Sequence, residues 1–164
     1  MAAAAIATIG VYGFSAATFM AALREHDVRL VLDVRQRRGV RGPEYAWANS
    51  RRLQEALAGA AISYRHHLEL APTTELRRLQ YREDDRLGVG KRSRVRLASE
   101  YAERYTREIL AHAELDALAA ELPDDGVSAL LCVERDPEAC HRSLAAERLA
   151  ARTGRLLTHI LPPD

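Results

Sequence analysis

The sequence predicts an α/β fold in which a mainly parallel sheet of about five strands is flanked by helices. Short β-branched and leucine-rich runs alternate with segments whose apolar residues recur at helical spacing, and polar loops separate the two. With 164 residues the chain is long enough to bury a core as one domain. We therefore expect a single domain over residues 1–164, with right-handed crossovers and a Rossmann-like arrangement.

The first part of the chain alternates strands and helices. Residues 6–13 form an apolar run that ends in glycines, and we expect Ser15 to cap the helix after it. Residues 28–34 favour a second strand, and the glycines and proline that follow predict a loop. We expect Ser50 to cap the second helix and Gly59 to close it.

The middle of the chain is expected to contain a third strand, a short helix and a loop. Residues 62–68 favour the strand and residues 72–81 the helix. Residues 82–94 are charged and interrupted by glycines, so we expect a flexible surface loop. Because side chains alternate along a strand, His66 and His67 cannot both face one site. We choose His66 as the site candidate and expect His67 to be solvated.

The last part repeats the alternation. Apolar and aromatic residues recur at helical spacing over residues 95–110, and a second helical piece extends to Pro123. Residues 127–133 and 155–161 favour the fourth and fifth strands. Between them we expect a helix that begins near Pro137.

Composition limits the class of protein. The net charge is only +1, which argues against a surface coated for non-specific nucleic-acid binding. Nearly all basic residues are arginines, with Lys91 the only lysine. Residues 1–7 lack a basic stretch and run into polar sequence, so we expect neither a signal peptide nor a membrane span, and a cytoplasmic location. Two cysteines do not make the disulfide framework of a small secreted fold.

The candidate site lies where the predicted strands end. Ligands of open parallel sheets sit outside the carboxyl ends of the strands. With the common strand order 3-2-1-4-5, residues 10–15 and residues 132–142 would face each other across a crevice. The residues that follow the strands and that we place in the site are Gly10, Tyr12, Ser15, Asp33, Arg35, Tyr64, His66, Glu69, Cys132 and Glu134.

The segment after the fourth strand carries a Cys-His-Arg sequence. Asp136 can cap the expected helix, and the following proline suits its first position, so Cys140, His141 and Arg142 would lie in the first turn or just beyond. A helix N-terminus stabilises a thiolate or binds a phosphate, and the arginine strengthens either.

Two other interpretations of this segment stay open. In a packing interpretation, both cysteines are small buried hydrophobes, and Glu134 forms an ion pair with Arg142. In a metal interpretation, Cys132, Cys140, His141 and His66 are ligands, but the spacing matches no zinc-finger pattern. Adjacent residues also point in different directions on a helix, so we predict no metal site.

Asp33 and the arginine loops are further candidates. Asp33 has the position of a ribose-binding acid, but Gly10 and Gly13 do not form the glycine pattern of dinucleotide folds. We therefore expect Asp33 to stay in the site as a partner of Arg35 or Arg142. Residues 35–42 and 90–96 could grip phosphate, although such charge runs are more often solvated.

Four segments give the chain a resemblance to the bacterial family known as domain of unknown function 488. They are, in order along the chain, "TIGVYGFS", "LVLDVRQRRG", "ISYRHHLEL" and "LLCVERDPEACHRSLAAERLA", and the resemblance extends over nearly the whole chain, from Ile6 to Leu161. Directly after the third segment stands Ala71, where glycine is usual in the family. The residues that the resemblance implies as the functional centre are Cys132, Glu134, Pro137, Cys140, His141 and Arg142, together with Asp33, Val34 and Arg35.

The chain also has a distant similarity to rhodanese-like domains. An Asp-Val-Arg sequence follows an early strand, and a cysteine at a strand end precedes a helix. This similarity implies Cys132 as a persulfide-carrying thiol, with Arg142 and Ser143 at the helix start. The loop is longer here and contains Glu134, an acid where an anionic substrate would approach.

These observations support three classes of function. The first is an enzyme that acts on a phosphate-bearing ligand, a nucleotide or nucleic acid, with Arg35 and Arg142 holding the anion and Glu134, Asp33 or His141 as acid or base. The second is thiol-based sulfur transfer or redox chemistry. The third is a non-catalytic module that binds nucleic acid or a protein. We favour the first. The sequence identifies no cofactor and no membrane partner, and it leaves enzymatic activity and oligomeric state open.

Overall fold

A computed structural model describes residues 3–164 and contains one five-stranded parallel sheet, which confirms the predicted α/β class. Each of the five apolar runs identified in the sequence contains one strand. The strands are β1 (Ala5–Ile9), β2 (Val28–Asp33), β3 (Ser63–His66), β4 (Val127–Leu131) and β5 (Leu157–Ile160).

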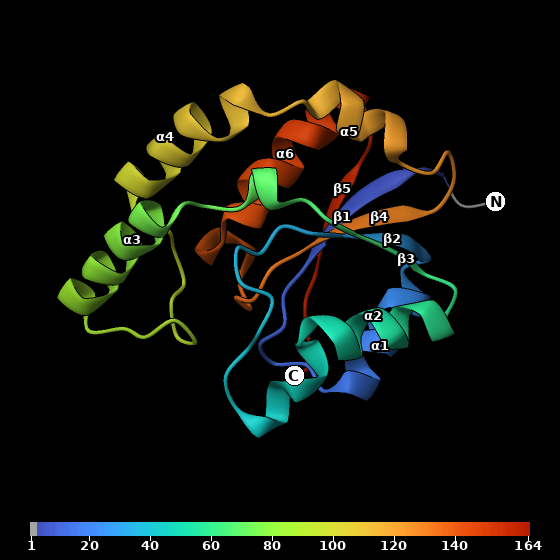
Figure 1. Ribbon diagram of the computed structural model, residues 1–164, viewed down its shortest axis with the longest axis horizontal. Helices are drawn as coiled ribbons and strands as arrows, with labels where there is room; N and C mark the ends of the chain where they lie inside the picture. Colours follow the sequence, from blue (N-terminus) through green and yellow to red (C-terminus); the bar gives the residue numbers. More distant parts are fainter. Residues whose placement is uncertain (1–2) are drawn as a thin grey trace.

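Helices flank the sheet on both faces. Figure 1 shows α1 and α2 on one face, α5 and α6 on the other, and α3 with α4 beyond the carboxyl ends of the strands. Among residues 3–164, no helix has the length and apolar character needed to cross a membrane. The helices are α1 (Ala16–Glu25), α2 (Ser50–Gly59), α3 (Thr74–Leu87), α4 (Ser99–Glu108), α5 (Leu115–Glu121) and α6 (His141–Thr153).

The strand order is β3-β2-β4-β1-β5, so the expected order 3-2-1-4-5 is wrong for its two central strands. The first and fourth strands are neighbours, as expected, but β4 also pairs with β2. Leu131 at the end of β4 lies level with Ile9 on one side and with Asp33 on the other. Three strand ends that carry candidate site residues therefore meet at one edge of the sheet.

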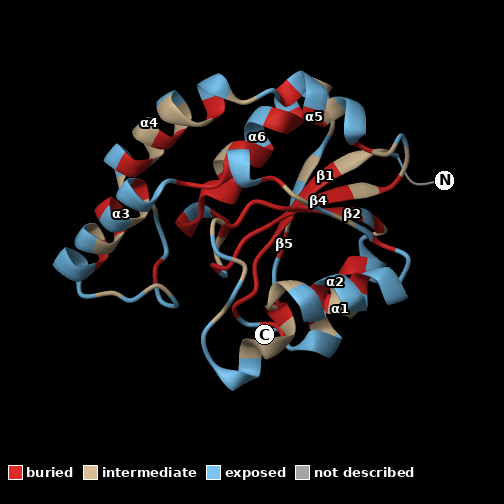
Figure 2. Cartoon of the chain, viewed as in Figure 1, coloured by how far each residue is buried: buried red, intermediate tan, exposed pale blue. Residues whose placement is uncertain are grey.

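The core lies between the sheet and its two helical layers. Ile6 and Ile9 of β1, Leu32 of β2 and Leu130 of β4 are completely buried, and Figure 2 shows buried residues concentrated in the central strands. Burial of one such side chain contributes about 1.5–3 kcal/mol to folding. The apolar runs of the sequence therefore form the buried strands, and the amphipathic helices cover them on both faces of the sheet.

One of three predicted helix starts matches the structure, and two differ from it. Ser15 caps α1 by accepting a hydrogen bond from the main-chain N–H of Thr18, as expected. The N-cap of α2 is Asn49, one residue before the predicted Ser50. Asp136 caps only a 3-10 turn, with no side-chain hydrogen bond, and α6 begins four residues after Pro137 because Cys140 has extended backbone angles.

Only residues 88–94 of the exposed loop predicted over residues 82–94 lie outside a helix, and most of them are exposed. α3 continues to Leu87, and Gly88 ends it in the left-handed conformation. Asp84 and Arg94 are both buried, and they form an ion pair with each other. The charges in this segment therefore include an internal pair, which sequence composition cannot distinguish from solvated charges.

Candidate functional site

A cavity of about 800 Å³ opens at the carboxyl ends of the strands. Its floor includes Cys132, Glu134 and His141, and Tyr12 follows β1 on one side. The loop after β2, the inner face of α3 and the loop after α3 supply the remaining walls. The basic residues that line the cavity are Arg35, Arg37, Arg41, Arg77, Lys91, Arg92 and Arg94.

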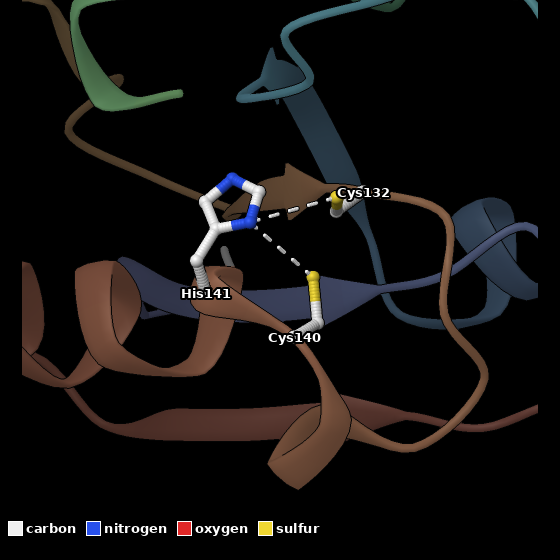
Figure 3. A group of neighbouring side chains, drawn as sticks. All are labelled: Cys132, Cys140 and His141. Carbon is white, nitrogen blue, oxygen red and sulfur yellow. Dashed lines mark hydrogen bonds between the residues drawn. The ribbon is translucent and has the colours of Figure 1, made fainter. Parts of the chain in front are cut away.

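Two cysteines and a histidine converge at the floor of the cavity. Nδ1 of His141 lies 3.9 Å from Sγ of Cys132 and 3.7 Å from Sγ of Cys140. Figure 3 shows both sulfurs turned toward the same ring nitrogen, one from the end of β4 and one from the start of α6. Both thiols are free. The other ring nitrogen, Nε2, lies 2.8 Å from the carbonyl oxygen of Val34, to which it donates, and this orients the ring.

The convergence of Cys140 and His141 corrects the expectation that adjacent residues would point apart. That expectation assumed that both residues are helical. Cys140 is instead the N-cap of α6, with φ −141° and ψ 144°, and His141 is the first helical residue. The change of backbone conformation between them lets both side chains turn toward Cys132. These three residues are the group in the described chain whose side chains could hold a metal, since their ligand atoms all lie within 4.8 Å of one another.

A buried ionic network joins Glu134 to α3. Oε1 of Glu134 accepts from Arg94 at 3.1 Å, and Arg94 also donates to Asp84 at 2.6 Å. The side-chain amide of Gln80 donates to the same aspartate at 2.9 Å. The thiol of Cys132 donates to Oε2 of Glu134 at 3.6 Å. The loop after α3 is therefore fixed to the floor of the cavity.

The two thiols have different electrostatic surroundings. Burial raises the pKa of the Cys132 thiol, and the neighbouring Cys140 and Glu134 raise it further. Burial also opposes ionisation of Cys140, but the Cys132 thiol, His141 and Arg142 outweigh it and lower the pKa of Cys140 well below its ordinary value. The pKa values of the two neighbouring thiols are therefore shifted in opposite directions.

The pKa values of the ionisable groups around these thiols are shifted by burial and by neighbouring charges. Burial, followed by the neighbouring Cys140, raises the pKa of Glu134 above its ordinary value. Burial lowers the pKa of His141, but Cys140, the hydrogen bond to the Val34 carbonyl and Glu134 together raise it, so the net shift is upward. Burial likewise opposes the charged form of Lys91, but the pKa of this side chain is raised overall by Glu134 and Cys132. Lys91 therefore remains a cation at the cavity wall.

Asp33 is a positioning residue below the cavity. Its two carboxylate oxygens accept from Nε and Nη2 of Arg35, both at 2.8 Å, and the hydroxyl of Tyr64 donates to it at 2.5 Å. The expected pairing of Asp33 with Arg35 is confirmed, whereas Asp33 and Tyr64 do not line the cavity. This network fixes the guanidinium of Arg35, which does line the cavity.

Arg142 is completely buried and does not line the cavity. Its Nη1 donates to the main-chain oxygen of Glu134 at 2.6 Å, and its Nη2 donates to that of Arg135 at 3.2 Å. The alternative in which Arg142 pairs with the Glu134 carboxylate is therefore wrong. Gly10 also lies against this carbonyl oxygen, which is only 1.9 Å from where a Cβ on Gly10 would stand. Arg142 and Gly10 shape the loop that carries Glu134.

The remaining candidates lie outside the cavity. Ser15 is an exposed helix cap, and His66 donates from Nε2 to the main-chain oxygen of Arg35 at 2.8 Å. Glu69 is exposed and accepts from Nδ1 of His67 at 2.5 Å. His67 is buried, so the expectation that it is solvated is wrong.

Sequence reasoning missed the contribution of α3. Leu76, Gln80 and Asp84 are all buried and are spaced four residues apart, which places them on one face of the helix. That spacing was visible in the sequence, but the buried face changes from apolar to polar along its length. Hydrophobic periodicity alone therefore ended the helix too early.

A family model described as Domain of unknown function DUF488 matches residues 15–149, well over half of the chain. The match covers β2, β3, β4, the arginine loops and the Cys-His-Arg segment. No curated protein and no solved structure matches the chain.

Proposed function

This chain belongs to the DUF488 family, and we propose that it is an enzyme that binds a phosphate-bearing ligand, a nucleotide or a nucleic-acid end, in the cavity at the strand ends. The observation that carries this proposal is the charge of the cavity. Among the described residues that line it, Glu134 is the one acid, against six arginines and Lys91. Such a wall attracts anions and holds them in place.

Some of these cations are not paired with an acid and can bind a ligand. Arg35 is paired with Asp33, and Arg94 is paired with Asp84 and Glu134, so these two shape the cavity. Across residues 3–164, by contrast, the side chains of Arg37 and Lys91 form no ion pair with an acid. Both residue types bind phosphate, arginine through its planar fork and lysine as a point charge.

The cavity also offers aromatic surface beside its cations. The guanidinium of Arg92 lies 5.3 Å from the ring centre of Tyr12, and that of Arg77 lies 5.7 Å from the ring centre of Tyr81. Aromatic rings next to cations suit a ligand that carries a base or a sugar together with its phosphate. The reactive groups Cys132, Glu134 and His141 lie at the floor, where they could act on such a ligand.

Binding can be tested by thermal denaturation with matched ligand pairs. A nucleoside 5′-phosphate and pyrophosphate should raise the melting temperature, whereas the corresponding nucleoside should not, because the phosphate provides the attraction. Lys91→Ala and Arg37→Ala should each weaken binding of the phosphate compounds by roughly tenfold. Arg51→Ala removes an exposed arginine of α2 outside the cavity and should leave binding unchanged. The proposal is wrong if no phosphate compound stabilises the protein.

A variant at Glu134 distinguishes an enzyme from a non-catalytic binding module. Incubation with each stabilising compound, followed by mass spectrometry of the small molecules, should show conversion by the wild-type protein and none by Glu134→Gln. A stabilising ligand that stays chemically unchanged under all conditions would favour the binding module instead.

Thiol chemistry is the second candidate because the pKa of Cys140 is lowered. Cys140 is only 1% exposed and does not line the cavity, whereas Cys132 lines it but lies beside Glu134. We therefore expect slow alkylation of both thiols by iodoacetamide in the native protein. Fast labelling of one thiol would instead support sulfur transfer or redox chemistry.

A further inference from the structure

We propose that Cys132, Cys140 and His141 form a binding site for a zinc-type metal ion at the floor of the cavity. The site lies below the cations that would hold a phosphate, and it involves none of them as ligands. Metal binding and phosphate binding can therefore be measured separately, and one can fail without the other.

The distances fit a single metal ion. A tetrahedral zinc ion separates its nitrogen and sulfur ligands by roughly 3.5–3.8 Å. The observed separations of 3.7 and 3.9 Å between Nδ1 of His141 and the two sulfurs are close to these values. The ligand atoms of all three residues lie within 4.8 Å of one another, so one ion can lie between them.

The histidine is oriented as metal-bound histidines usually are. Its Nε2 donates to the Val34 carbonyl at 2.8 Å, which leaves the lone pair of Nδ1 facing the sulfurs. A main-chain carbonyl on the outer ring nitrogen is a common partner of histidines that bind metals, because it fixes both the tautomer and the ring plane. The contact with Val34 does not involve the cysteines, yet it also leaves Nδ1 of His141 as the atom that can bind the metal.

The ligand types select the class of metal. Two thiolates and an imidazole favour zinc and other soft or borderline ions, whereas magnesium and calcium prefer oxygen. The two thiolates also cancel the charge of a divalent ion. A neutral centre can therefore lie beneath a wall of arginines without adding to their repulsion.

The position of the site indicates an open coordination position. Cys132 and His141 line the cavity, whereas Cys140 lies behind them. An ion bound between the three would have its fourth position on the cavity side, where Glu134 is also located. Three protein ligands and one open position are the arrangement of catalytic zinc sites, while structural sites have four protein ligands. The inferred metal is thus placed to meet a ligand in the cavity.

Cobalt(II) is the probe for this site, since it reports tetrahedral thiolate coordination by its visible and near-ultraviolet absorption. Reduced, metal-free protein titrated with cobalt(II) without any phosphate compound should bind one ion per chain, with thiolate charge-transfer and tetrahedral bands that zinc abolishes. Cys132→Ser and Cys140→Ser should each weaken binding by more than about 100-fold, since even lost outer partners cost 10–100-fold. His66→Gln is the matched control, because His66 also donates from Nε2 to a main-chain carbonyl but lies away from the cysteines.

A measurement on the unmodified chain covers the case in which the cysteine variants do not fold. Zinc should raise the melting temperature of the wild-type protein, and a chelator should reverse the effect. The inference is overturned if reduced wild-type protein gives no cobalt bands and no stabilisation by zinc. It is also overturned if the bands survive in both folded cysteine variants.

Discussion

At the scale of single residues, Gly10 and Arg142 determine where the reactive side chains stand. Both lie against the main-chain oxygen of Glu134, one as a residue without a side chain and the other as a buried donor. The close approach also lets the amides of Val11 and Tyr12 donate to the carbonyl of Val133. The loop after β1 and the loop after β4 are thereby held together at the edge of the cavity.

Gly10→Ala should destabilise the protein because the new Cβ would stand 1.9 Å from a main-chain oxygen that cannot rotate away. We expect a loss of about 3 kcal/mol in the free energy of unfolding. For a chain of this size that corresponds to a melting temperature lower by roughly 6–12 °C. Gly59→Ala is the control, because nothing lies within 4 Å of its Cβ position. Equal melting temperatures for the two variants would contradict this account.

At the scale of elements, α3 and the loop after it form one wall of the cavity. Asp84 on α3 holds Arg94, which in turn reaches Glu134 at the floor. All three side chains are less than 9% exposed, so the interactions are shielded from water and from salt. The wall carries Lys91 between these anchors, and its position therefore depends on the ionic network.

Asp84→Ala should therefore loosen this wall. Loss of one partner leaves a buried guanidinium incompletely paired, and we expect a cost of about 3 kcal/mol. Hydrogen exchange should become faster in residues 88–98, and phosphate binding should weaken because Lys91 loses its support. Glu83→Ala on the same helix removes only an exposed pair with Arg86 and should leave both properties unchanged. Unaltered exchange in residues 88–98 of the Asp84 variant would show that the network does not hold the wall.

At the scale of the whole molecule, the strand order determines which loops meet. Because β4 lies between β1 and β2, the segment that follows it touches the loops after both neighbours. Val133 contacts the loop after β1 through its main-chain oxygen, and His141 contacts Val34 after β2. With the order expected from sequence, β2 would have been next to β1 instead, and the fourth strand would have been one position further away.

The same order predicts a gradient of hydrogen exchange across the sheet. β4 is paired on both sides and is almost completely buried, whereas β3 is an edge strand whose residues are at least partly exposed. Amides of β4 should exchange only through global unfolding, and those of β3 through smaller openings, so β3 should exchange faster. Mass spectrometry of peptides from the two strands measures the difference. Equal protection of β3 and β4 would be inconsistent with an edge position for β3.

Much of the architecture follows from the sequence by itself. The five apolar runs, the helix that Ser15 caps and the end of β2 at Asp33 depend on residues near one another in the chain. Local periodicity and capping chemistry record such features directly. The grouping of Cys132, Glu134 and His141 also follows, because carboxyl ends of parallel strands share one edge of the sheet.

Only the tertiary structure decided which groups become partners. The chain has many arginines and acids, and residue type alone does not indicate that Glu134 pairs with Arg94 while Arg142 binds main-chain carbonyls. The meeting of Cys140 and His141 depends on the backbone angles of one residue, and the central position of β4 depends on how the crossovers pack. Pairing between distant groups is a property of the whole folded chain, whereas strands and caps arise from neighbouring residues.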